Sequence, residues 1–370
     1  MSTIGIDARL LYYRQGGIAA YTRHLIEQLA ALDSTTRYDI LHSRKDPHTL
    51  APGPNFARVS LWTPSHHRLE SWALAAEIIR LRLDVLHSPD FIPPLRGARR
   101  YVITVHDLNF LYYPQFLTAD SRRYYSGQIA RAVRQADHIL ACSQATRNDL
   151  IERLGVPESR ITVHLEGVDS SFHPLPEEEI AAACRTLSLP RGFILFVGTF
   201  EPRKNLAGLL DAYHRLRVSL SDAPPLVLAG RRGWLYETLF ERVANLGLEA
   251  HVLWREDIPQ PLLPALYNAA AVLVLPSFYE GFGLTALEAM ACGTPVIVTN
   301  RSAPPEIVGE AGLLIDPDQP EEIAARLQEV LTDSALSARL RRAGLARAAM
   351  FTWQQTATVT HRVYQQLLSS

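Results

Sequence analysis

Short runs of β-branched and other apolar residues alternate with segments of helical periodicity along the chain. This alternation is typical of parallel α/β sheets, in which a helix follows each strand. In the first half, the runs expected to form strands are TIGIDA (3–8), YDILHS (38–43), VLHSP (85–89), YVITVHD (101–107), HILACS (138–143) and ITVHLE (161–166). Helical patterns lie between them at 18–31, 68–82, 120–135 and 144–154.

A second series begins after VDSSFHPLPEEE, a Pro- and Ser-containing joint near 168–179. Its expected strands are ILFVGT (194–199), PLVLAG (225–230), HVLW (251–254), AVLVLPS (271–277), PVIVT (295–299) and GLLID (312–316). The pattern predicts an α/β protein of two Rossmann-like domains, residues 1–170 and 175–350, facing each other across a cleft. The tail at 352–370 has a helical pattern without a following strand, so we expect it to pack on the first domain.

The composition allows two domains and sets no global preference for a charged partner. The chain has 370 residues, of which 47% are hydrophobic and 20% charged, as in ordinary globular proteins. Its 37 basic and 38 acidic residues give a net charge of −1, so no overall field attracts nucleic acid, and none is expected as a partner. Any anion must be recognised locally.

The cysteines and the apolar runs indicate the compartment. The three cysteines, Cys142, Cys184 and Cys292, are far apart and show no CxxC spacing, which argues against disulfides and a zinc site. The start, MSTIGIDARLLYY, lacks the pattern of a signal peptide, and no uncharged apolar run approaches about 18 residues. We therefore expect a cytoplasmic protein.

One amphipathic segment bears on membranes. PSHHRLESWALAAEIIRLRLD (64–84) carries several basic residues and is a candidate for peripheral contact with an anionic membrane, here on the inner face. A helix that packs on the first sheet and keeps a solvated basic face would give the same pattern.

Cations follow the first strand of the second domain. In open α/β sheets ligands bind at the carboxyl ends of strands, and here ILFVGT leads into FEPRKN, with Arg203 and Lys204 before a helix that begins near Asn205. Two cations beside a helix N-terminus predict a local anion site. A solvated basic turn is the alternative, and it applies more strongly to Arg231 and Arg232 after the next strand.

Glycines and carboxylates come together in PSFYEGFGLTALEAMACGTPVIVT (276–299). Gly281 and Gly283 allow the backbone to approach a ligand or to adopt positive φ before a helix expected at 284–291. Glu280 precedes this helix and Glu288 lies more than a turn inside it, so they should reach different parts of one ligand, as acceptors for vicinal hydroxyls. Alternatively, Glu288 is a helix-surface residue with an ion-pair partner.

The first domain has weaker signals. Gly16 and Gly17 follow the first strand and can admit a phosphate to the next helix, although a simple turn explains such a pair equally and GxGxxG is absent. His106 ends the apolar strand YVITVHD, which places a polar group at the predicted ligand edge. A structural histidine with satisfied hydrogen bonds is the alternative.

Taken together, these residues resemble the retaining glycosyltransferases of family 4, which have the GT-B fold. The most specific part is Glu280-x7-Glu288 within FYEGFGLTALEAMACGTPVI. The other matching segments are GTFEPRKN, TVHDLNFLYYP, ACSQATRNDLIERLGVPESRITVHLEGVD and SAPPEIVGEAGLLIDP.

The resemblance implies a nucleotide-diphosphate sugar on the second domain and an acceptor on the first. Arg203 and Lys204 would neutralise the departing diphosphate, Glu280 would bind sugar hydroxyls and Glu288 the ribose, and His106 would position the sugar and help stabilise charge at the reacting carbon. The backbone N–H groups expected to meet phosphate or sugar oxygens are those of Gly17, Gly281, Phe282, Gly283 and Leu284.

The family is thought to retain configuration by same-face attack, with the leaving phosphate taking the acceptor's proton. GDP-mannose is the first expectation for the donor and UDP-glucose the second; the acceptor would be a growing polysaccharide or a lipid-linked glycan. No metal cofactor is expected, because the cations supply its charge and helix capping explains Asp316-Pro317-Asp318 better than a metal site. Alternatives are a nucleotide-sugar epimerase or phosphorylase, a non-catalytic sugar-nucleotide-binding subunit, and a hydrolase in which Glu280 and Glu288 form the carboxylate pair.

Overall fold

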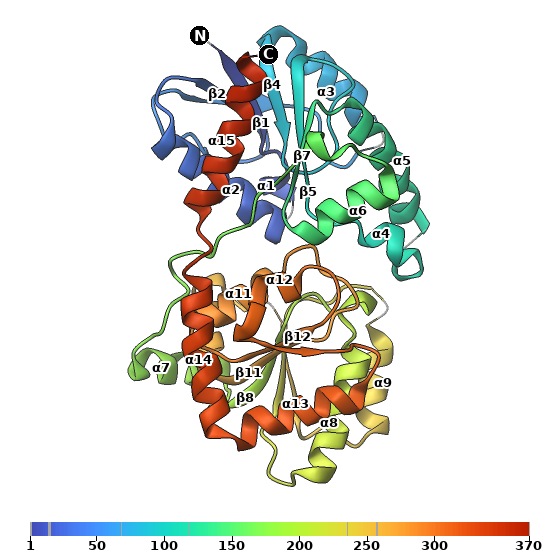
Figure 1. Ribbon diagram of the computed structural model, residues 1–370, viewed down its shortest axis with the longest axis vertical. Coiled ribbons are helices and arrows are strands. Elements are labelled where there is room, and N and C mark those ends of the chain that lie inside the picture. Colours follow the sequence, from blue (N-terminus) through green and yellow to red (C-terminus); the bar gives the residue numbers. More distant parts are fainter. Residues whose placement is uncertain are drawn as a thin grey trace. The chain divides into compact units, whose positions relative to one another are not determined.

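Two parallel α/β units make up the chain (Figure 1). The computed structural model describes residues 2–13, 16–67, 69–117, 119–234, 236–256 and 258–369. Unit 1 comprises residues 1–167 and 352–370, and unit 2 comprises residues 168–351. The expected fold class, α/β with two Rossmann-like sheets, is confirmed.

Unit 1 contains a seven-stranded parallel sheet with the order β3-β2-β1-β4-β5-β6-β7. Its strands are β1 Thr3–Asp7, β2 Arg37–Ser43, β3 Phe56–Leu61, β4 Leu83–Ser88, β5 Ala98–Val105, β6 His138–Ala141 and β7 Ile161–Val163. Ile4 of β1 lies opposite Tyr38 on one side and Val85 on the other. The central strands are buried on both faces, which is why they read as continuous apolar runs.

The apolar pattern of the first half predicts six strands and does not mark β3, so the number is corrected to seven. β3 is the edge of the sheet and only its two end residues, Phe56 and Leu61, are buried. Arg58 and Ser60 lie between them and are hydrogen-bonded to each other. A half-exposed edge strand can carry polar residues, and FARVSL therefore lacks the apolar run that marks the buried strands.

Helices and short 3₁₀ turns connect the strands of unit 1. They are α1 Leu10–Tyr13, α2 Gly17–Leu32, α3 Glu70–Ile78, η1 Ile79–Leu81, α4 Asn109–Tyr112, η2 Pro114–Phe116, α5 Ala119–Gln135, α6 Gln144–Leu154 and η3 Glu158–Arg160. α6 shows how local sequence sets the ends: the Ser143 hydroxyl accepts from the Thr146 N–H, and Gly155 closes the helix at φ 62°.

The C-terminal tail forms α15, Trp353–Ser369, and belongs to unit 1, where Figure 1 shows it beside α2. The Tyr364 hydroxyl lies 2.5 Å from Nδ1 of the buried His87, and the Thr356 hydroxyl donates to the Leu165 carbonyl. A Cβ on Gly167 would lie 2.2 Å from the Trp353 backbone nitrogen, so only glycine allows the chain to pass this helix so closely.

Unit 2 contains a six-stranded parallel sheet with the order β10-β9-β8-β11-β12-β13. Its strands are β8 Phe193–Val197, β9 Leu226–Ala229, β10 Val252–Arg255, β11 Ala270–Leu275, β12 Val296–Thr299 and β13 Leu313–Ile315. The connections are α7 Glu177–Leu187, η4 Pro202–Lys204, α8 Leu206–Ser219, α9 Glu237–Asn245, η5 Gln260–Leu262, α10 Leu263–Ala269, α11 Leu284–Ala291, α12 Pro304–Val308, η6 Gly309–Ala311, α13 Pro320–Thr332 and α14 Ser334–Ala348.

Two further findings concern the cysteines and the apolar helices. All three cysteines are free and buried. In the part of the chain that the structure describes, no helix combines the length and the apolar character needed to cross a bilayer.

Candidate active site

The loop after β8 holds the two predicted cations in a fixed turn. Arg203 and Lys204 form η4, and Asn205 then adopts a left-handed conformation (φ 54°) as the N-cap of α8. The Asn205 side chain accepts from the Gly208 N–H at 3.2 Å and donates to the Pro317 carbonyl at 2.7 Å. Bonds to both its own helix and a distant loop fix the turn that carries the cations.

The loop after β11 holds Glu280. The Ser277 hydroxyl donates to Glu280 Oε1 at 2.5 Å, and the Glu280 N–H donates to the Ser302 hydroxyl at 2.9 Å. Ser302 itself adopts φ 54°, a left-handed conformation that is uncommon outside glycine. The carboxylate is thus positioned by groups from two strand-end loops.

These loops form one charged cluster. Lys204 Nζ lies 2.6 Å from Glu280 Oε1, and Arg203 Nη1 lies 3.0 Å from Glu280 Oε2. Arg203 also donates to Glu201 Oε1 through Nη2 at 2.6 Å. Burial alone would raise the pKa of Glu280, but the charges of Lys204 and Arg203 lower it to about 2, so Glu280 is ionised at neutral pH.

The cluster brings together three predicted site residues and adds one that sequence reasoning missed. Arg203 and Lys204 are not a solvated basic turn: their side chains are only 16% and 12% exposed. Glu201, two positions before Arg203, went unnoticed although its place in the same strand-end loop was a usable signal. By contrast, Arg232 after β9 is about half exposed and pairs with Glu256. This exposure fits the solvated basic turn that was the alternative for that loop.

The predicted helix at 284–291 is α11, with the bounds expected from the sequence. Its N-cap is Gly283 at φ 107°, a backbone conformation that explains glycine there. Leu284 opens the helix, and Phe282 is buried with its ring edge-to-face against Phe351 at 6.1 Å. The Ala286 and Leu287 N–H groups donate to the Gly283 carbonyl at 3.0 and 3.2 Å. Contact of the backbone from Gly281 to Leu284 with a ligand stays a prediction.

Glu288 lies apart from the charged cluster. Its Oε2 accepts from the Tyr267 hydroxyl at 2.7 Å, and no Lys or Arg of the described residues forms an ion pair with it. The suggested ion-pair partner is therefore not found. The pKa of Glu288 is raised to about 7, mainly by burial. The hydrogen bond from Tyr267 lowers this pKa, and the charge of Asp169 raises it further. Glu280 and Glu288 thus have opposite electrostatic environments.

His106 follows β5 in unit 1, and both of its ring nitrogens face acceptors. Nδ1 lies 2.9 Å from Glu166 Oε1 and Nε2 lies 2.9 Å from the Pro89 carbonyl. Burial by itself would lower the pKa of His106, but the hydrogen bond and charge of Glu166 raise it. Two acceptors favour the imidazolium form of this side chain. Glu166 was also missed, although it ends a predicted strand.

Gly16 and Gly17 lie at the start of α2, as predicted. Gly16 is the N-cap at φ 141° and Gly17 is the first helical residue, while Arg14 and Gln15 fall outside the described residues. The Gly16 carbonyl accepts from the Ala20 N–H at 3.0 Å. The contact of the Gly17 N–H with a phosphate stays a prediction.

Two acidic groups bear on metals. Helix capping does not explain Asp316 and Asp318, which is a correction: the N-cap of α13 is Gln319, and both carboxylates instead bind Arg301 Nη2, at 2.7 and 2.5 Å. Within the described ranges, one set of three candidate ligands, His106, Cys142 and Glu166, has its ligand atoms within 4.8 Å of one another. Burial raises the pKa of the Cys142 thiol well above its usual value, and that thiol donates to the His106 carbonyl. The hydrogen bonds account for this set without an ion.

Comparison with known proteins adds the class. Residues 15–172 match the model of the Glycosyltransferase Family 4 domain, and residues 186–347 match that of Glycosyl transferases group 1. The chain is 35% identical over 303 residues to O-antigen chain mannosyltransferase B of Escherichia coli, with 82% of this chain and 78% of that protein covered. It is 31% identical over 285 residues to serotype-specific mannosyltransferase WbdA of Escherichia coli, covering 75% of this chain but only 35% of that longer protein.

Among solved structures, sucrose-phosphate synthase from Thermosynechococcus elongatus shares the fold, with a TM-score of 0.78 over 100% of both chains at 23% identity. The two parallel α/β units have the GT-B fold, and the two domain models place the chain among the glycosyltransferases. The chain belongs to glycosyltransferase family 4. It is therefore an enzyme of the glycosyltransferase class, and this class sets aside the non-catalytic and epimerase alternatives.

Proposed function

We propose that the chain transfers a mannosyl residue from GDP-mannose to a hydroxyl of a growing polysaccharide or lipid-linked glycan, with retention of the anomeric configuration. The two Escherichia coli relatives named as mannosyltransferases support the sugar, and UDP-glucose is the second candidate donor. The observation that carries the proposal is the pair of cations, Arg203 and Lys204, held against Glu280 at the carboxyl edge of the unit 2 sheet.

The cations act on the bond that breaks. When the anomeric C–O bond cleaves, its electron pair stays with the diphosphate and positive charge builds on the sugar carbon. Fixed cations aimed at the diphosphate lower this barrier because they need no reorganisation during the reaction, and mostly buried groups are screened little by water. Glu201 and Glu280 hold the two cations in place.

The carboxylates bind hydroxyls in two different ways. Glu280 is ionised and has lone pairs beyond those used by Lys204, Arg203 and Ser277, so it can accept from hydroxyls of the donor sugar. Glu288 accepts from Tyr267 and can accept from the ribose. Its raised pKa makes this second contact dependent on pH near neutrality.

His106 contributes charge and shape in this mechanism. Since both ring nitrogens are engaged, it is not available to move a proton. The acceptor hydroxyl attacks from the face that the diphosphate leaves, and its proton passes to the leaving phosphate oxygen. No metal enters the proposal, because Arg203 and Lys204 supply the charge that a metal would.

Donor binding and product analysis test this function. Thermal unfolding in the presence of GDP-mannose, GDP, UDP-glucose and UDP should show the largest stabilisation with the guanosine ligands, because a ligand that binds only the folded state raises its apparent stability. With a mannoside acceptor, the one-bond C1–H1 coupling constant of the new mannosyl residue in the NMR spectrum should report an α-linkage, and EDTA should leave the rate unchanged. Stabilisation by UDP-glucose alone, or a β-linked product, would reject the proposed donor or the proposed retention.

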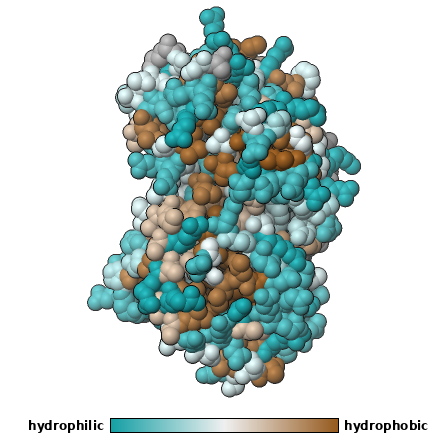
Figure 2. All heavy atoms as spheres, viewed as in Figure 1, coloured by the Kyte–Doolittle hydropathy of each residue, from teal (hydrophilic) through white to brown (hydrophobic). Residues whose placement is uncertain are grey.

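We also propose that unit 1 contacts an anionic membrane through the face around α3. Leu69, Trp72 and Ile79 are 61%, 69% and 55% exposed, and Trp62, whose N–H donates to Glu77 of α3, is 68% exposed. The guanidinium of Arg44 lies 3.4 Å above the Trp62 ring, and Arg80 and Arg82 are exposed nearby in sequence. Figure 2 shows hydrophobic residues at the surface in several separate groups, so the combination with basic residues is what favours this face.

Vesicle co-sedimentation tests the contact. The chain should bind vesicles that contain phosphatidylglycerol and should bind pure phosphatidylcholine vesicles weakly. Replacing Trp62 and Trp72 by Ser should reduce binding about tenfold or more, since each tryptophan buries a large amphipathic ring at the interface. The matched control is Val218→Ser on α8, an equally exposed apolar residue at 78%. Binding that is insensitive to both tryptophans would remove the proposed contact.

A further inference from the structure

Three carboxylates surround a small pocket at the carboxyl edge of the unit 1 sheet. Asp7, Glu70 and Asp90 line it. So do Ser65 and Ser88, whose Oγ atoms are inaccessible to solvent and make no hydrogen bond with the described residues. The cavity has a volume of about 20 Å³, which is room for about one water molecule. This pocket is therefore too small for a sugar or a nucleotide.

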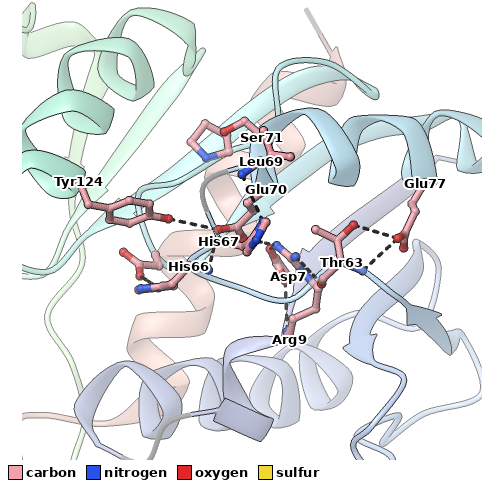
Figure 3. A network of polar contacts seen from close by, with 12 residues as sticks. Asp7, Arg9, Thr63, His66, His67, Leu69, Glu70, Ser71, Glu77 and Tyr124 are labelled. Carbon is pink, nitrogen blue, oxygen red and sulfur yellow. Dashed lines mark hydrogen bonds and ion pairs between the residues drawn. The ribbon is translucent and has the colours of Figure 1, made fainter. Parts of the chain in front are cut away.

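Both oxygens of Glu70 are occupied by protein donors (Figure 3). Arg9 Nη2 donates to Oε1 at 2.7 Å, and the His66 N–H donates to Oε2 at 2.7 Å. The Tyr124 hydroxyl adds a longer bond to Oε2, at 3.3 Å. Arg9 is fully buried and its Nη2 also lies 2.6 Å from Asp7 Oδ2. A carboxylate with donors from several segments holds these segments together and has little capacity left for a ligand.

Glu288 of α11 has the opposite arrangement, with a single protein donor. Its Oε2 accepts from the Tyr267 hydroxyl at 2.7 Å, whereas its Oε1 makes no hydrogen bond with the described residues and remains accessible to solvent. Glu288 is partly exposed, and Tyr267 is completely buried. One oxygen of this carboxylate thus faces a fixed protein group, and the other is open to a ligand.

Tyr267 is itself fixed by its surroundings in unit 2. Its ring packs edge-to-face against Phe172, with centroids 5.8 Å apart, and its carbonyl accepts from the Thr294 hydroxyl at 2.7 Å. The next residue, Asn268, donates to the His173 carbonyl at 2.9 Å. These contacts tie α10 to the segment before α7 and to the turn after α11, so the position of the Tyr267 hydroxyl is set by the fold.

The Tyr267 hydroxyl acts only as a donor to Glu288. Burial, followed by the charge of Glu288, raises the pKa of Tyr267 well above its usual value, so the phenol keeps its proton. Within the described part of the chain, Glu288 is the one acceptor of this hydroxyl. Because a buried donor without an acceptor is unfavourable, the bond keeps the Glu288 side chain in one orientation.

The charges around Glu288 make this bond important for its ionisation. The titratable groups that face Glu288 are Tyr267 from α10, Asp169 from the segment before α7 and Cys292 at the end of α11. Arg341 of α14, which packs on the same helix, instead donates to a backbone carbonyl. Burial raises the pKa of Glu288 to about 7, and the hydrogen bond from Tyr267 acts in the opposite direction. Without this bond the carboxyl would stay protonated to a higher pH and would accept fewer hydrogen bonds.

We propose that Tyr267 is a positioning residue for donor binding: its hydroxyl holds Oε2 of Glu288, so that Oε1 faces the hydroxyls of the donor's ribose. The proposal rests on the proposed function, in which Glu288 binds the ribose, and it adds the residue that prepares this contact. Since the carboxylate is oriented before the donor arrives, little side-chain freedom is lost on binding. Tyr267 is completely buried and therefore acts through Glu288, without touching the donor.

The test compares GDP with 2′,3′-dideoxy-GDP, which lacks both ribose hydroxyls, by isothermal titration calorimetry on the full chain. The parent should bind GDP at least about tenfold more tightly, as expected for a hydrogen bond to a charged group. Tyr267→Phe should reduce this preference to about threefold or less and leave the affinity for the dideoxy analogue unchanged. Unchanged binding of the analogue also shows that the site is folded, because a general structural defect would weaken both ligands alike.

The pH dependence of the preference gives a second readout. In the parent, the preference for GDP should decline as pH falls below about 7, since protonation of Glu288 removes an acceptor. In Tyr267→Phe the decline should begin at higher pH, because the lost hydrogen bond had lowered the pKa of Glu288.

The matched control is Tyr213→Phe. Tyr213 is also completely buried in unit 2, and its hydroxyl donates to the Pro224 carbonyl at 2.9 Å. This variant should lose a similar amount of stability in thermal unfolding and should retain both the preference for GDP and its pH dependence.

Three results would overturn the proposal: an undiminished preference in Tyr267→Phe, an equal loss in both tyrosine variants, or equal binding of GDP and its analogue by the parent. The last of these leaves the proposed function intact. The same measurements with UDP and 2′,3′-dideoxy-UDP separate the role of Tyr267 from the choice of donor. If the uridine pair alone shows the expected pattern, GDP-mannose is rejected and Tyr267 keeps its role; if the parent binds neither nucleotide, the proposed function fails together with the proposal.

Discussion

Each unit places an arginine among carboxylates at the carboxyl edge of its sheet, yet the two arginines lie at different depths. In unit 2, Arg203 and Lys204 face Glu201 and Glu280, and both cations are partly accessible. In unit 1, Arg9 is completely buried, and three carboxylates line the pocket in front of it. The difference lies in which sign of charge is accessible at the edge of the sheet.

This difference shows that strand-end position alone does not define a ligand. A cation that remains partly exposed beside a second cation can exchange its carboxylate for a diphosphate. A fully buried arginine is fixed by its carboxylates and cannot reach a ligand. The fold supplies the same edge twice, and the depth of the arginine decides whether its charge is accessible there.

The largest expected effect concerns Arg9. Arg9→Met should destabilise unit 1 by about 3–5 kcal/mol, because it leaves Asp7 and Glu70 buried without their cation. Hydrogen-exchange mass spectrometry should show lost protection in β1 and β4 and little change in β8 and β11. Arg203→Met is the matched variant in unit 2 and should cost roughly 1–2 kcal/mol, since Lys204 still pairs with Glu280. Equal costs in the two units would mean that the depth of the arginine does not distinguish the clusters.

The next effect concerns turnover. Lys204→Ala should reduce kcat about 10²–10³-fold, which is typical for the loss of one group that stabilises charge in the transition state. Glu280→Ala should also remove most of the activity while the fold is retained, as circular dichroism would show. Arg232→Ala, at the end of the neighbouring strand and paired with Glu256, should stay within about twofold of the parent. A similar decrease of kcat in Arg232→Ala would indicate that overall positive charge matters, and that Lys204 does not act at a specific site.

The smallest effect depends on pH. The pKa of Glu288 in the folded state is about 7, above the ordinary value of 4.5. Because the unfolded chain releases this proton more readily, the free energy of unfolding falls as pH rises from 4.5 to 7. Glu288→Gln mimics the protonated form. It should match the parent near pH 5 and exceed it by about 1–2 kcal/mol above pH 7.5, as thermal unfolding at a series of pH values would measure. A constant gap across this range would show that Glu288 does not titrate there.

Local features of the sequence predicted most elements, because their causes lie within a few residues. Gly283, with its positive φ, marks the start of α11, and the helix has the predicted bounds. Asn205 likewise marks the start of α8. The edge strand β3 was missed because a strand that is half exposed need not be apolar, so the pattern that identifies its buried neighbours is absent.

The sequence by itself determined the two parallel sheets, the strand-end cations, the glycines before α11 and the family. The tertiary structure alone decided which charges meet. Lys204 pairs with Glu280, 76 positions away, Arg9 with Glu70, 61 positions away, and His106 with Glu166, 60 positions away. Periodicity and caps act over one or two turns, whereas these pairs depend on the order of strands in a sheet, which brings loops together that are far apart in the chain.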